Sequence, residues 1–533
     1  MRLLAGTGVL MRLVARRDRA LLAVWVVLLG LFPLLMVIAQ ESLQGDLASR
    51  RAFVASIDSN SAFLMLYGSA YGASRGALGV WAAGAGFWFV AVASMLTVIR
   101  HTRTDEETGR RELLGATVVG RHAGLAAALI VTLAANLALA LVAVLSLVVV
   151  GLPIGGSLAF GLSLAAVGWT FAALAAVAAQ LTVSAQAARG LAFAGFGAAW
   201  LLRAVGDAAG PDGAASWLAW LSPLGWARMV RPFGGERWAL LLLMLVVTIT
   251  LTAGAVALAA RRDVGAGVLR PRLGPAAAAP GLRTPLALAW RLHRGRMLAW
   301  TAGIALLSGV MSTSAKSAAD LFESSPGMGR MFELVGSGSG PSEIFLSAIM
   351  GMLGLLAGAY GVAAMLRVRV EETAARAEPL LATSVSRLRW ATSHLVFALL
   401  GPAVALGAAG LAGGLVYGSS SGELGRELPR VLAGALVQLP AVWILVGVTL
   451  ALFGLRPRQA WGSWVPLGAF VLLWAVAMSL QLSQWLLNLS PFNQVPKLPG
   501  GAVATTPLLW LLGLAAALVV AGLAGFRGRD LES

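Results

Sequence analysis

Residues 103–121 read RTDEETGRRELLGATVVGR, and residues 369–387 read RVEETAARAEPLLATSVSR. The two stretches align without a gap at a distance of 266 residues, and Asp105 stands opposite Glu371. Nine of the nineteen positions are identical: Arg103/Arg369, Glu106/Glu372, Arg110/Arg376, Glu112/Glu378, Leu114/Leu380, Ala116/Ala382, Thr117/Thr383, Val119/Val385 and Arg121/Arg387. A charged loop has no reason to repeat its acids and small residues at fixed spacing, so we interpret the chain as internally duplicated.

The repeated stretch is embedded in a very apolar chain. Of the 533 residues, 59% are hydrophobic and 12% are charged, whereas soluble domains carry about 25% charged residues. A helix needs about 20 apolar residues to cross a bilayer. Twelve runs reach or approach that length: Ala20–Gln40, Ala77–Ile99, Ala123–Val150, Ser157–Val183, Ala187–Val205, Trp238–Ala260, Met297–Ala315, Ile344–Leu366, Ala391–Tyr417, Val431–Leu455, Trp461–Leu480 and Pro507–Phe526. Outer-membrane strands would instead alternate over about ten residues.

The pattern predicts an all-α polytopic membrane protein with 12 transmembrane helices, arranged as two homologous six-helix halves. We expect a first half at residues 1–262, a cytoplasmic linker at 263–285 and a second half at 286–533. Each half should open with an amphipathic piece. In the first half, Leu3, Leu10, Leu13 and Val14 can share one helical face, and the counterpart in the second half is Leu286–Arg296. Each half also carries Leu-Ser-Pro before its last span, at 221–223 and 489–491.

The formal charge of +17 could indicate nucleic-acid binding, but its location favours membrane topology. With both termini placed in the cytoplasm, most arginines fall in the inner segments, as the positive-inside rule requires. The basic blocks lack the interleaved aromatic residues of a nucleic-acid surface. We therefore expect a multi-pass protein of the bacterial plasma (inner) membrane that does not bind nucleic acid.

The sequence lacks the residues and motifs on which catalytic, metal and nucleotide sites usually depend. There is no cysteine, which excludes thiolate metal sites. A phosphate-binding loop needs Gly-Lys-Ser/Thr, but the two lysines, Lys316 and Lys497, follow Ala315 and Pro496. Any ATP hydrolysis must come from another polypeptide. No catalytic or metal site is predicted, so we expect a transport subunit that is not itself an enzyme and holds no cofactor.

An ion-coupled carrier normally keeps a carboxylate inside its bundle. Here all 23 acidic residues fall in loops or at the ends of spans, with Asp207 nearest to an intramembrane position. Ion coupling is therefore disfavoured. Arg203 and Asp207 form a candidate pair at the outer end of the fifth span, with a possible role as an outer gate.

The repeated stretch should lie on the cytoplasmic side, between the second and third spans of each half. Glu106 and Arg110, like Glu372 and Arg376, are spaced i,i+4 in the order that favours a helix. We interpret each stretch, near 101–121 and 367–387, as a short surface helix that docks a partner. The alternative is a solvated loop.

The charged repeat, placed after the second span of two six-span halves, resembles the fused permease of type-2 ATP-binding-cassette exporters. More narrowly it resembles the actinobacterial antibiotic (polyketide, tetronasin-resistance type) exporter permeases. The resemblance implies that two copies of a separate ATPase subunit, which hold ATP and Mg, dock on the two stretches. The contact residues it implies are Arg103, Asp105, Glu106, Arg110, Glu112, Thr117, Arg121, Arg369, Glu371, Glu372, Arg376, Glu378, Thr383 and Arg387.

Two departures within the repeat bear on symmetry. Pro379 replaces Leu113 and Ala375 replaces Gly109. A proline would end or reset the second helix, so the two dockings are expected to be unequal. The sequence also predicts that charge reversal at both Glu106 and Glu372 releases the ATPase and leaves the permease folded.

The resemblance implies export of hydrophobic small molecules, such as drugs or antibiotics, through an apolar and aromatic cavity between the two halves. Membrane lipids are expected as further partners. Candidate lining residues are Phe87, Trp88, Phe89, Asn136 and Trp200. The alternatives are a lipid or glycolipid exporter, an ion-coupled secondary transporter, or a membrane assembly protein that moves nothing.

Overall fold

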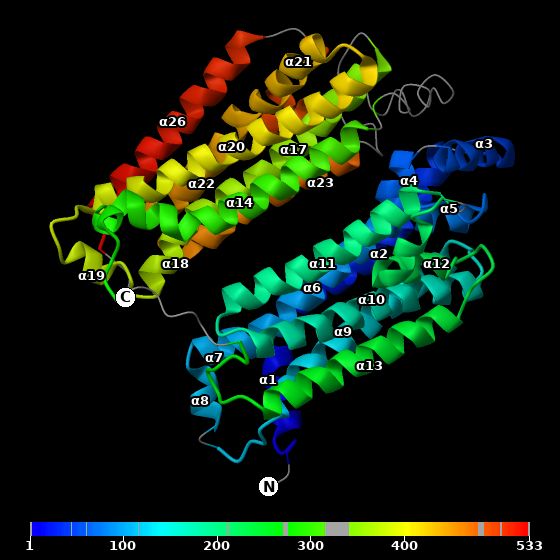
Figure 1. The fold of residues 1–533 in the computed structure, drawn as a ribbon, viewed down its shortest axis with the longest axis horizontal. Helices are drawn as coiled ribbons and strands as arrows, with labels where there is room; N and C mark the ends of the chain where they lie inside the picture. Colours follow the sequence, from blue (N-terminus) through cyan, green and yellow to red (C-terminus); the bar gives the residue numbers. More distant parts are fainter. Residues whose placement is uncertain are drawn as a thin grey trace. The chain divides into compact units, whose positions relative to one another are not determined.

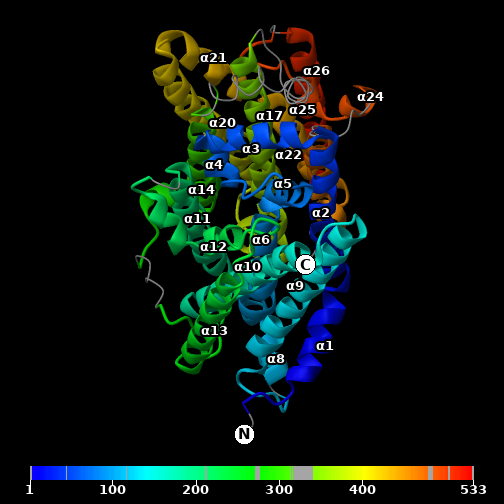
Figure 2. The same cartoon turned by 90° about the vertical axis from the view of Figure 1, so that its right-hand side faces the viewer.

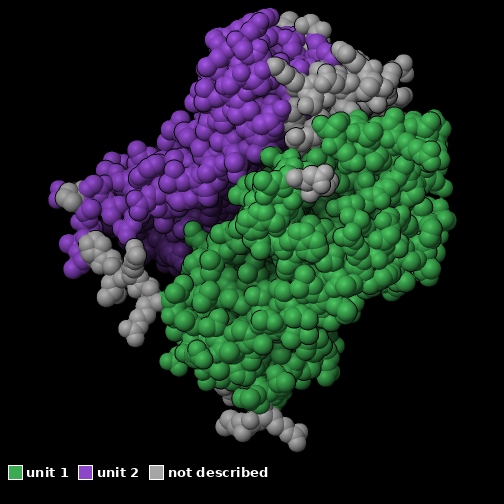
Figure 3. All heavy atoms as spheres, turned by 45° about the vertical axis from the view of Figure 1, so that its right-hand side comes forward, with its two compact units in different colours: residues 1–274 green, residues 275–533 purple. Residues whose placement is uncertain are grey.

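A computed structural model describes the chain except residues 1–2, 44, 60, 116, 211–212, 270–275, 314, 316–339, 478–483, 502–503 and 531–533. Every regular element in the described part is a helix, which confirms the all-α prediction. The chain divides into two compact units, residues 1–274 and 275–533, shown in different colours in Figure 3. The boundary falls inside the segment predicted as a linker. The described residues of this segment that belong to the first unit pack on the end of α10. There the backbone carbonyls of Gln180 and Leu181 accept hydrogen bonds from the backbone N–H groups of Val268 and Leu269.

The first unit holds the helices up to residue 260 (Figure 1). Their bounds are α1 (Thr7–Arg17), α2 (Arg19–Leu43), α3 (Leu47–Asp58), α4 (Ser61–Tyr67), α5 (Arg75–Ala82), η1 (Ala83–Ala85), α6 (Gly86–Ile99), η2 (Arg100–Thr104), α7 (Asp105–Glu107), α8 (Arg110–Gly115), α9 (Ala123–Val149), α10 (Ile154–Leu181), α11 (Ala185–Ala208), η3 (Ser216–Leu221), α12 (Pro223–Met229) and α13 (Ala239–Ala260).

Helix α10 is the centre of the first unit. It contacts α6, α9, α11 and α13, and most of its residues are buried. Its sequence is rich in Gly, Ala and Ser, and small residues let helix backbones approach closely in a membrane. At Gly161, for example, a Cβ atom would lie 2.9 Å from the carbonyl oxygen of Ala140 on α9. Figures 1 and 2 show α7 and α8 at one end of this unit and α3, α4 and α5 at the other.

The second unit contains the remaining helices. Their bounds are η4 (Pro280–Arg283), α14 (Pro285–Ser312), α17 (Pro341–Met365), α18 (Arg367–Thr373), α19 (Glu378–Leu381), α20 (Arg387–Ser421), α21 (Leu424–Leu436), α22 (Leu439–Leu455), η5 (Pro457–Ser463), α23 (Trp464–Ala477), α24 (Gln484–Leu487), α25 (Pro491–Gln494) and α26 (Thr505–Gly528). Helix α17 is largely buried and packs against α14, α20 and α22, while α22 pairs with α26.

Among the described residues, ten helices are long and apolar enough to cross a membrane, and they match ten of the twelve expected spans. The other two are the seventh and the eleventh. Helix α14 covers the seventh and has 28 residues, but it carries arginines in its first half. Helix α23 covers only part of the eleventh span, whose last residues lie outside the described part. Ser314, near the end of the seventh expected span, and Lys316, just after it, also lie outside the described part. The count of twelve and the homology of the halves stay predictions.

The two opening pieces differ from expectation and from each other. Helix α1 packs against α9 through Leu10 and Val14, but Leu13 is 48% exposed and Leu3 precedes the helix. Only Asp18 separates α1 from α2. In the second unit the expected piece is continuous with the following span, because α14 runs unbroken from Pro285 to Ser312.

Candidate functional site

The repeated stretch of the first unit is not a single helix. Helix α6 continues through a π-helical turn, η2, into α7, which ends at Glu107. Gly109 then adopts a φ of 71°, and α8 starts at Arg110. Because a residue with positive φ cannot continue a right-handed helix, the predicted surface helix is broken into two short helices joined at about its middle.

The second unit repeats this break. Helix α18 ends at Thr373, Ala375 has a φ of 53°, and α19 starts at Glu378. Pro379 lies in the first turn of α19, where a missing N–H is tolerated. Helices α8 and α19 end at equivalent residues, but α19 starts two residues later. Because the first unit breaks at the equivalent position without a proline, the break does not depend on Pro379, and the expected inequality of the two dockings stays a prediction.

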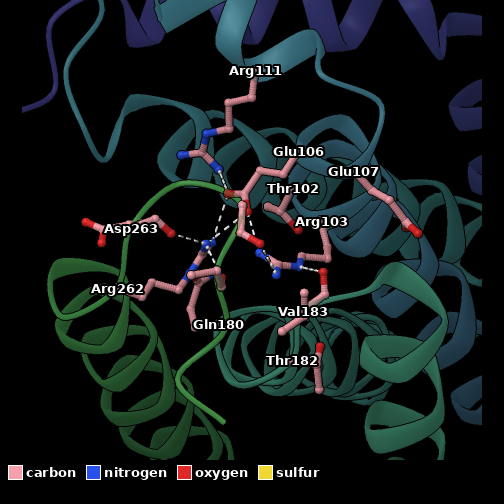
Figure 4. A network of polar contacts seen from close by, with 12 residues as sticks. Thr102, Arg103, Glu106, Glu107, Arg111, Gln180, Thr182, Val183, Arg262 and Asp263 are labelled. Carbon is pink, nitrogen blue, oxygen red and sulfur yellow. Dashed lines mark hydrogen bonds and ion pairs between the residues drawn. The ribbon is translucent and has the colours of Figure 1, made fainter. Parts of the chain in front are cut away.

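Glu106 is the centre of a buried cluster of charges. Its side chain is 2% exposed, and its carboxylate accepts from Arg103 Nη1 at 2.5 Å and Arg111 Nη1 at 2.6 Å. Arg262, which follows α13, donates from both Nη atoms at 2.9 Å (Figure 4). We call Arg103, Glu106, Arg111 and Arg262 the first clamp. It joins the end of α6 to the end of α13.

Further hydrogen bonds fix the first clamp to neighbouring helix ends. Arg103 Nε donates to the carbonyl of Val183 at 2.8 Å, and Arg262 Nε donates to Gln180 Oε1 at 2.8 Å. Arg121 Nη2 donates to the carbonyl of Arg262 at 2.8 Å. Since Gln180 lies at the end of α10 and Val183 lies between α10 and α11, the repeated stretch of the first unit is held to the ends of α10, α11 and α13.

The second unit builds an equivalent cluster around Glu372, whose side chain is 2% exposed. Arg529 follows the last helix, α26, and its two Nη atoms donate to Glu372 at 2.7 and 2.8 Å. Arg369 Nη1 lies 3.5 Å from the same carboxylate. Arg387, the equivalent of Arg121, donates to the carbonyl of Arg529 at 2.6 Å. We call Arg369, Glu372 and Arg529 the second clamp.

The two clamps are stabilised by different neighbours. Arg111 has no arginine counterpart, because the equivalent residue is the buried Ala377. Burial lowers the pKa of the Arg111 guanidinium, while the charge of Glu106 opposes this shift. In the second unit the Arg529 guanidinium lies 4.8 Å from the ring centre of Phe453 and 5.1 Å from that of Phe526, so cation–π contacts accompany its ion pair.

The ion pairs predicted from i,i+4 spacing are therefore wrong. Arg110 lies 3.5 Å from Asp105 instead of pairing with Glu106, and Arg376 lies 3.8 Å from Glu371 instead of pairing with Glu372. Asp105 also pairs with Arg17 of α1 at 2.8 Å. The break after α7 and after α18 turns Arg110 and Arg376 away from the buried acids, whereas Arg111 still reaches Glu106.

The structure splits the predicted contact residues into two groups. Those in or beside the clamps pair within the chain and are largely buried, except Arg121, which is exposed although it donates to the carbonyl of Arg262. Those after the break are exposed in both units: Arg110, Glu112 and Thr117, and Arg376, Glu378 and Thr383. We call these two sets the first and second tip. Leu113 and Val118, beside the first tip, are 77% and 93% exposed.

Sequence reasoning missed Arg262 and Arg529, although a signal was present. Each is followed by an aspartate, and each Arg-Asp pair starts within two residues of the end of the last described helix of its unit. In both units this arginine Nη1 also donates to the carbonyl of the following aspartate. A search for repeats outside the charged stretch would have found the pair.

Gly109 and Ala375 share a positive φ, and this predicts opposite effects of substitution at the two positions. Because an L-residue in the left-handed region costs about 1–2 kcal/mol, Ala375→Gly should stabilise the protein and Gly109→Ala should destabilise it. A Cβ at Gly109 would have no heavy atom within 4 Å, so the effect there is one of backbone conformation alone. The thermal unfolding midpoints of the two purified variants should shift in opposite directions. If both variants kept the unfolding midpoint of the wild type, φ at these positions would not limit stability.

The five predicted cavity residues do not gather in one group, although two of them are in contact. Phe87 is buried and lines a small cavity that includes none of the other four. Trp88 packs edge-to-face on Trp200, with ring centres 6.3 Å apart, while Phe89 is 55% exposed. Asn136 is fully buried and donates to Ser94 Oγ and to the carbonyl of Thr132. Their role in binding a substrate stays a prediction.

Arg203 and Asp207 do form the predicted pair. Arg203 is 1% exposed, and its Nη1 donates to Asp207 Oδ2 at 3.2 Å. Its Nη2 donates to the carbonyls of Met65 and Leu66 on α4. The pair thus fixes α4 to α11; a gating role stays a prediction.

Comparison with known proteins is consistent with this architecture. The chain is 45% identical over 528 residues to the multidrug efflux system permease protein Rv1217c of Mycobacterium tuberculosis (strain ATCC 25618 / H37Rv), covering 99% of this chain and 95% of that protein. Residues 282–527 match the family described as multidrug efflux system permease Rv1217c, C-terminal domain. With its many apolar helices, the chain is a multi-pass membrane protein, and it belongs to the Rv1217c family of multidrug efflux system permeases.

Proposed function

We propose that this chain is the permease subunit of an ATP-driven exporter of hydrophobic small molecules, and that a separate ATPase subunit docks on each tip. The observation that supports this proposal is that the two repeated stretches, near 101–121 and 367–387, are built in the same way; we call them the coupling segments. In each unit an exposed tip, bearing both signs of charge, follows directly after a buried clamp. Efflux of drugs is the activity named for the 45% identical relative.

The first tip favours a protein partner over a solvated loop. Leu113 and Val118 are large apolar side chains that are almost fully exposed, next to the charged residues Arg110 and Glu112. Apolar patches rimmed by charge commonly mark sites of protein interaction. The equivalent residues of the second unit are Pro379 and Ser384, so the two dockings should differ in strength.

The clamps give a path for mechanical coupling. In the first unit the tip follows α6 and α7, and Glu107 Oε2 accepts from the backbone N–H of Ala185 at the start of α11. Arg262 adds α13 to the same cluster. A movement of the tip is therefore passed to several spans together. ATP can drive transport only if ATP and substrate favour different states of the permease.

The proposed orientation follows from the same assignment. We place both tips and both termini in the cytoplasm, with ATP and Mg bound by the partner, in a bacterial plasma membrane. No Gly-Lys-Ser/Thr motif occurs in the sequence, so the energy source is assigned to the partner.

The test is reconstitution of the full chain with its candidate ATPase in liposomes. We expect the ATPase to co-purify, hydrophobic drugs to stimulate its hydrolysis, and drug movement to require ATP. Drug movement under a proton gradient without the ATPase would instead identify an ion-coupled carrier. ATPase binding without substrate-stimulated hydrolysis would indicate an assembly protein, and stimulation by lipids alone would indicate a lipid exporter.

A further inference from the structure

A small cavity lies in the first unit where α5, α6, α10 and α12 meet. Its volume is about 30 Å³, and its walls include Tyr71, Trp81, Phe87, Phe160, Arg228 and Arg231. Pockets for drug-sized molecules measure about 300–1,000 Å³. This cavity therefore suits a ligand of a few atoms at most.

The cavity is lined by two cations and by no acidic residue. Arg228 Nη2 and Arg231 Nε are buried, and neither has a hydrogen-bond partner among the described residues. Asp207, whose charge also acts on Arg228, is held by Arg203. The local group thus contains three guanidinium groups and one carboxylate. Buried donors without an acceptor are costly, so the arrangement calls for an added acceptor of negative charge.

The backbone around the two arginines is built to hold them in place. A Cβ at Gly84 would lie 2.8 and 2.9 Å from the two Nη atoms of Arg228, so the guanidinium packs closely against the backbone at this glycine. Arg231 has a φ of 55°, and its guanidinium lies 4.4 Å from the ring centre of Tyr71. Such a conformation in a non-glycine residue is strained, and strain of this kind clusters at ligand sites.

We propose that this cavity binds a monatomic anion of halide size, with chloride as the physiological ligand, between Arg228 and Arg231. The anion accepts hydrogen bonds from both guanidinium groups and neutralises part of their excess charge. Burial lowers the pKa of Arg228 and raises the pKa of Tyr71, which fits a site with little water, where an ionic interaction is strong. The bound anion stabilises the arrangement of α5, α6, α10 and α12 around the cavity.

The first test measures stability of the purified full chain as chloride replaces gluconate at constant ionic strength. A ligand that binds only the folded state raises the unfolding midpoint with its concentration. We expect a saturable rise with chloride or bromide and none with sulfate, which is too large. Arg231→Gln should weaken the halide response about tenfold or more, the loss expected for one hydrogen bond to a charged group.

Arg51→Gln is the matched control. Arg51 is exposed, does not line the cavity and is not among the charges that act on Tyr71 or Arg228, but its loss changes the net charge equally, so its halide response should equal that of the wild type. The ³⁵Cl NMR line width of the unmodified protein gives a direct reading, even if Arg231→Gln does not fold. Saturable broadening that bromide reverses supports the site. No broadening, or a halide response unchanged in Arg231→Gln, would mean that only water fills the cavity and would overturn the proposal.

Discussion

Replacing both Glu106 and Glu372 by lysine should prevent the permease from keeping its folded state. Each glutamate side chain is 2% exposed and pairs with arginines from helix ends far apart in the sequence. Breaking a buried ion pair by removing one partner costs about 3–5 kcal/mol, which is a large share of the roughly 5–15 kcal/mol that stabilises a typical protein. Lysine adds repulsion from the arginines that remain.

The measurement is the yield of monodisperse protein and its thermal unfolding midpoint in detergent. Glu112→Lys with Glu378→Lys is the matched control, because it changes the net charge equally at exposed positions. Exposed substitutions usually change stability by less than about 0.5 kcal/mol. The sequence alone predicted that the Glu106 and Glu372 variant folds and loses its ATPase. A folded variant with a wild-type midpoint and no bound ATPase would restore that interpretation.

The same control variant should lose the proposed ATPase partner. With Glu112 and Glu378 replaced by lysine, each tip keeps its arginine and gains a second positive charge. Like charges placed together across an interface cost several kcal/mol, and each 1.4 kcal/mol is a factor of ten. We expect the affinity for the ATPase to fall about 100-fold or more and ATP-dependent drug transport to stop, with folding unchanged.

Co-purification with the ATPase and drug-stimulated hydrolysis measure this effect. Glu41→Lys with Glu423→Lys is the control, since both residues are exposed and form surface pairs with Arg75 and Arg426. Surface pairs contribute about 0–1 kcal/mol, and both residues lie outside the tips. Full ATPase binding by the Glu112 and Glu378 variant would place the docking surface elsewhere on the permease.

Together the two double variants distinguish two roles of each charged stretch, which are attachment to the spans and binding of a partner. The buried glutamates should determine whether the coupling segment is held to the spans, and the exposed glutamates whether a partner binds to it. This division follows from the positive φ at Gly109 and Ala375, because the break there separates the exposed tip residues from the buried glutamates. In the first stretch Arg111 still reaches back to Glu106.

Composition and hydrophobic run length determined the fold class, since each span depends on its own residues and on the thickness of the bilayer. The repeat could also be recognised from the sequence alone, and it identified Glu106 and Glu372 as candidate functional residues. The i,i+4 rule then assigned them the wrong partners, because it assumes an unbroken helix. Their actual partners, Arg262 and Arg529, lie 156 and 157 residues away, and only folding brings them close. Whether a charged side chain is buried or exposed depends on neighbours from other helices. The tertiary structure alone therefore decided which of the repeated charges hold the helices of each unit together and which remain exposed to meet a partner.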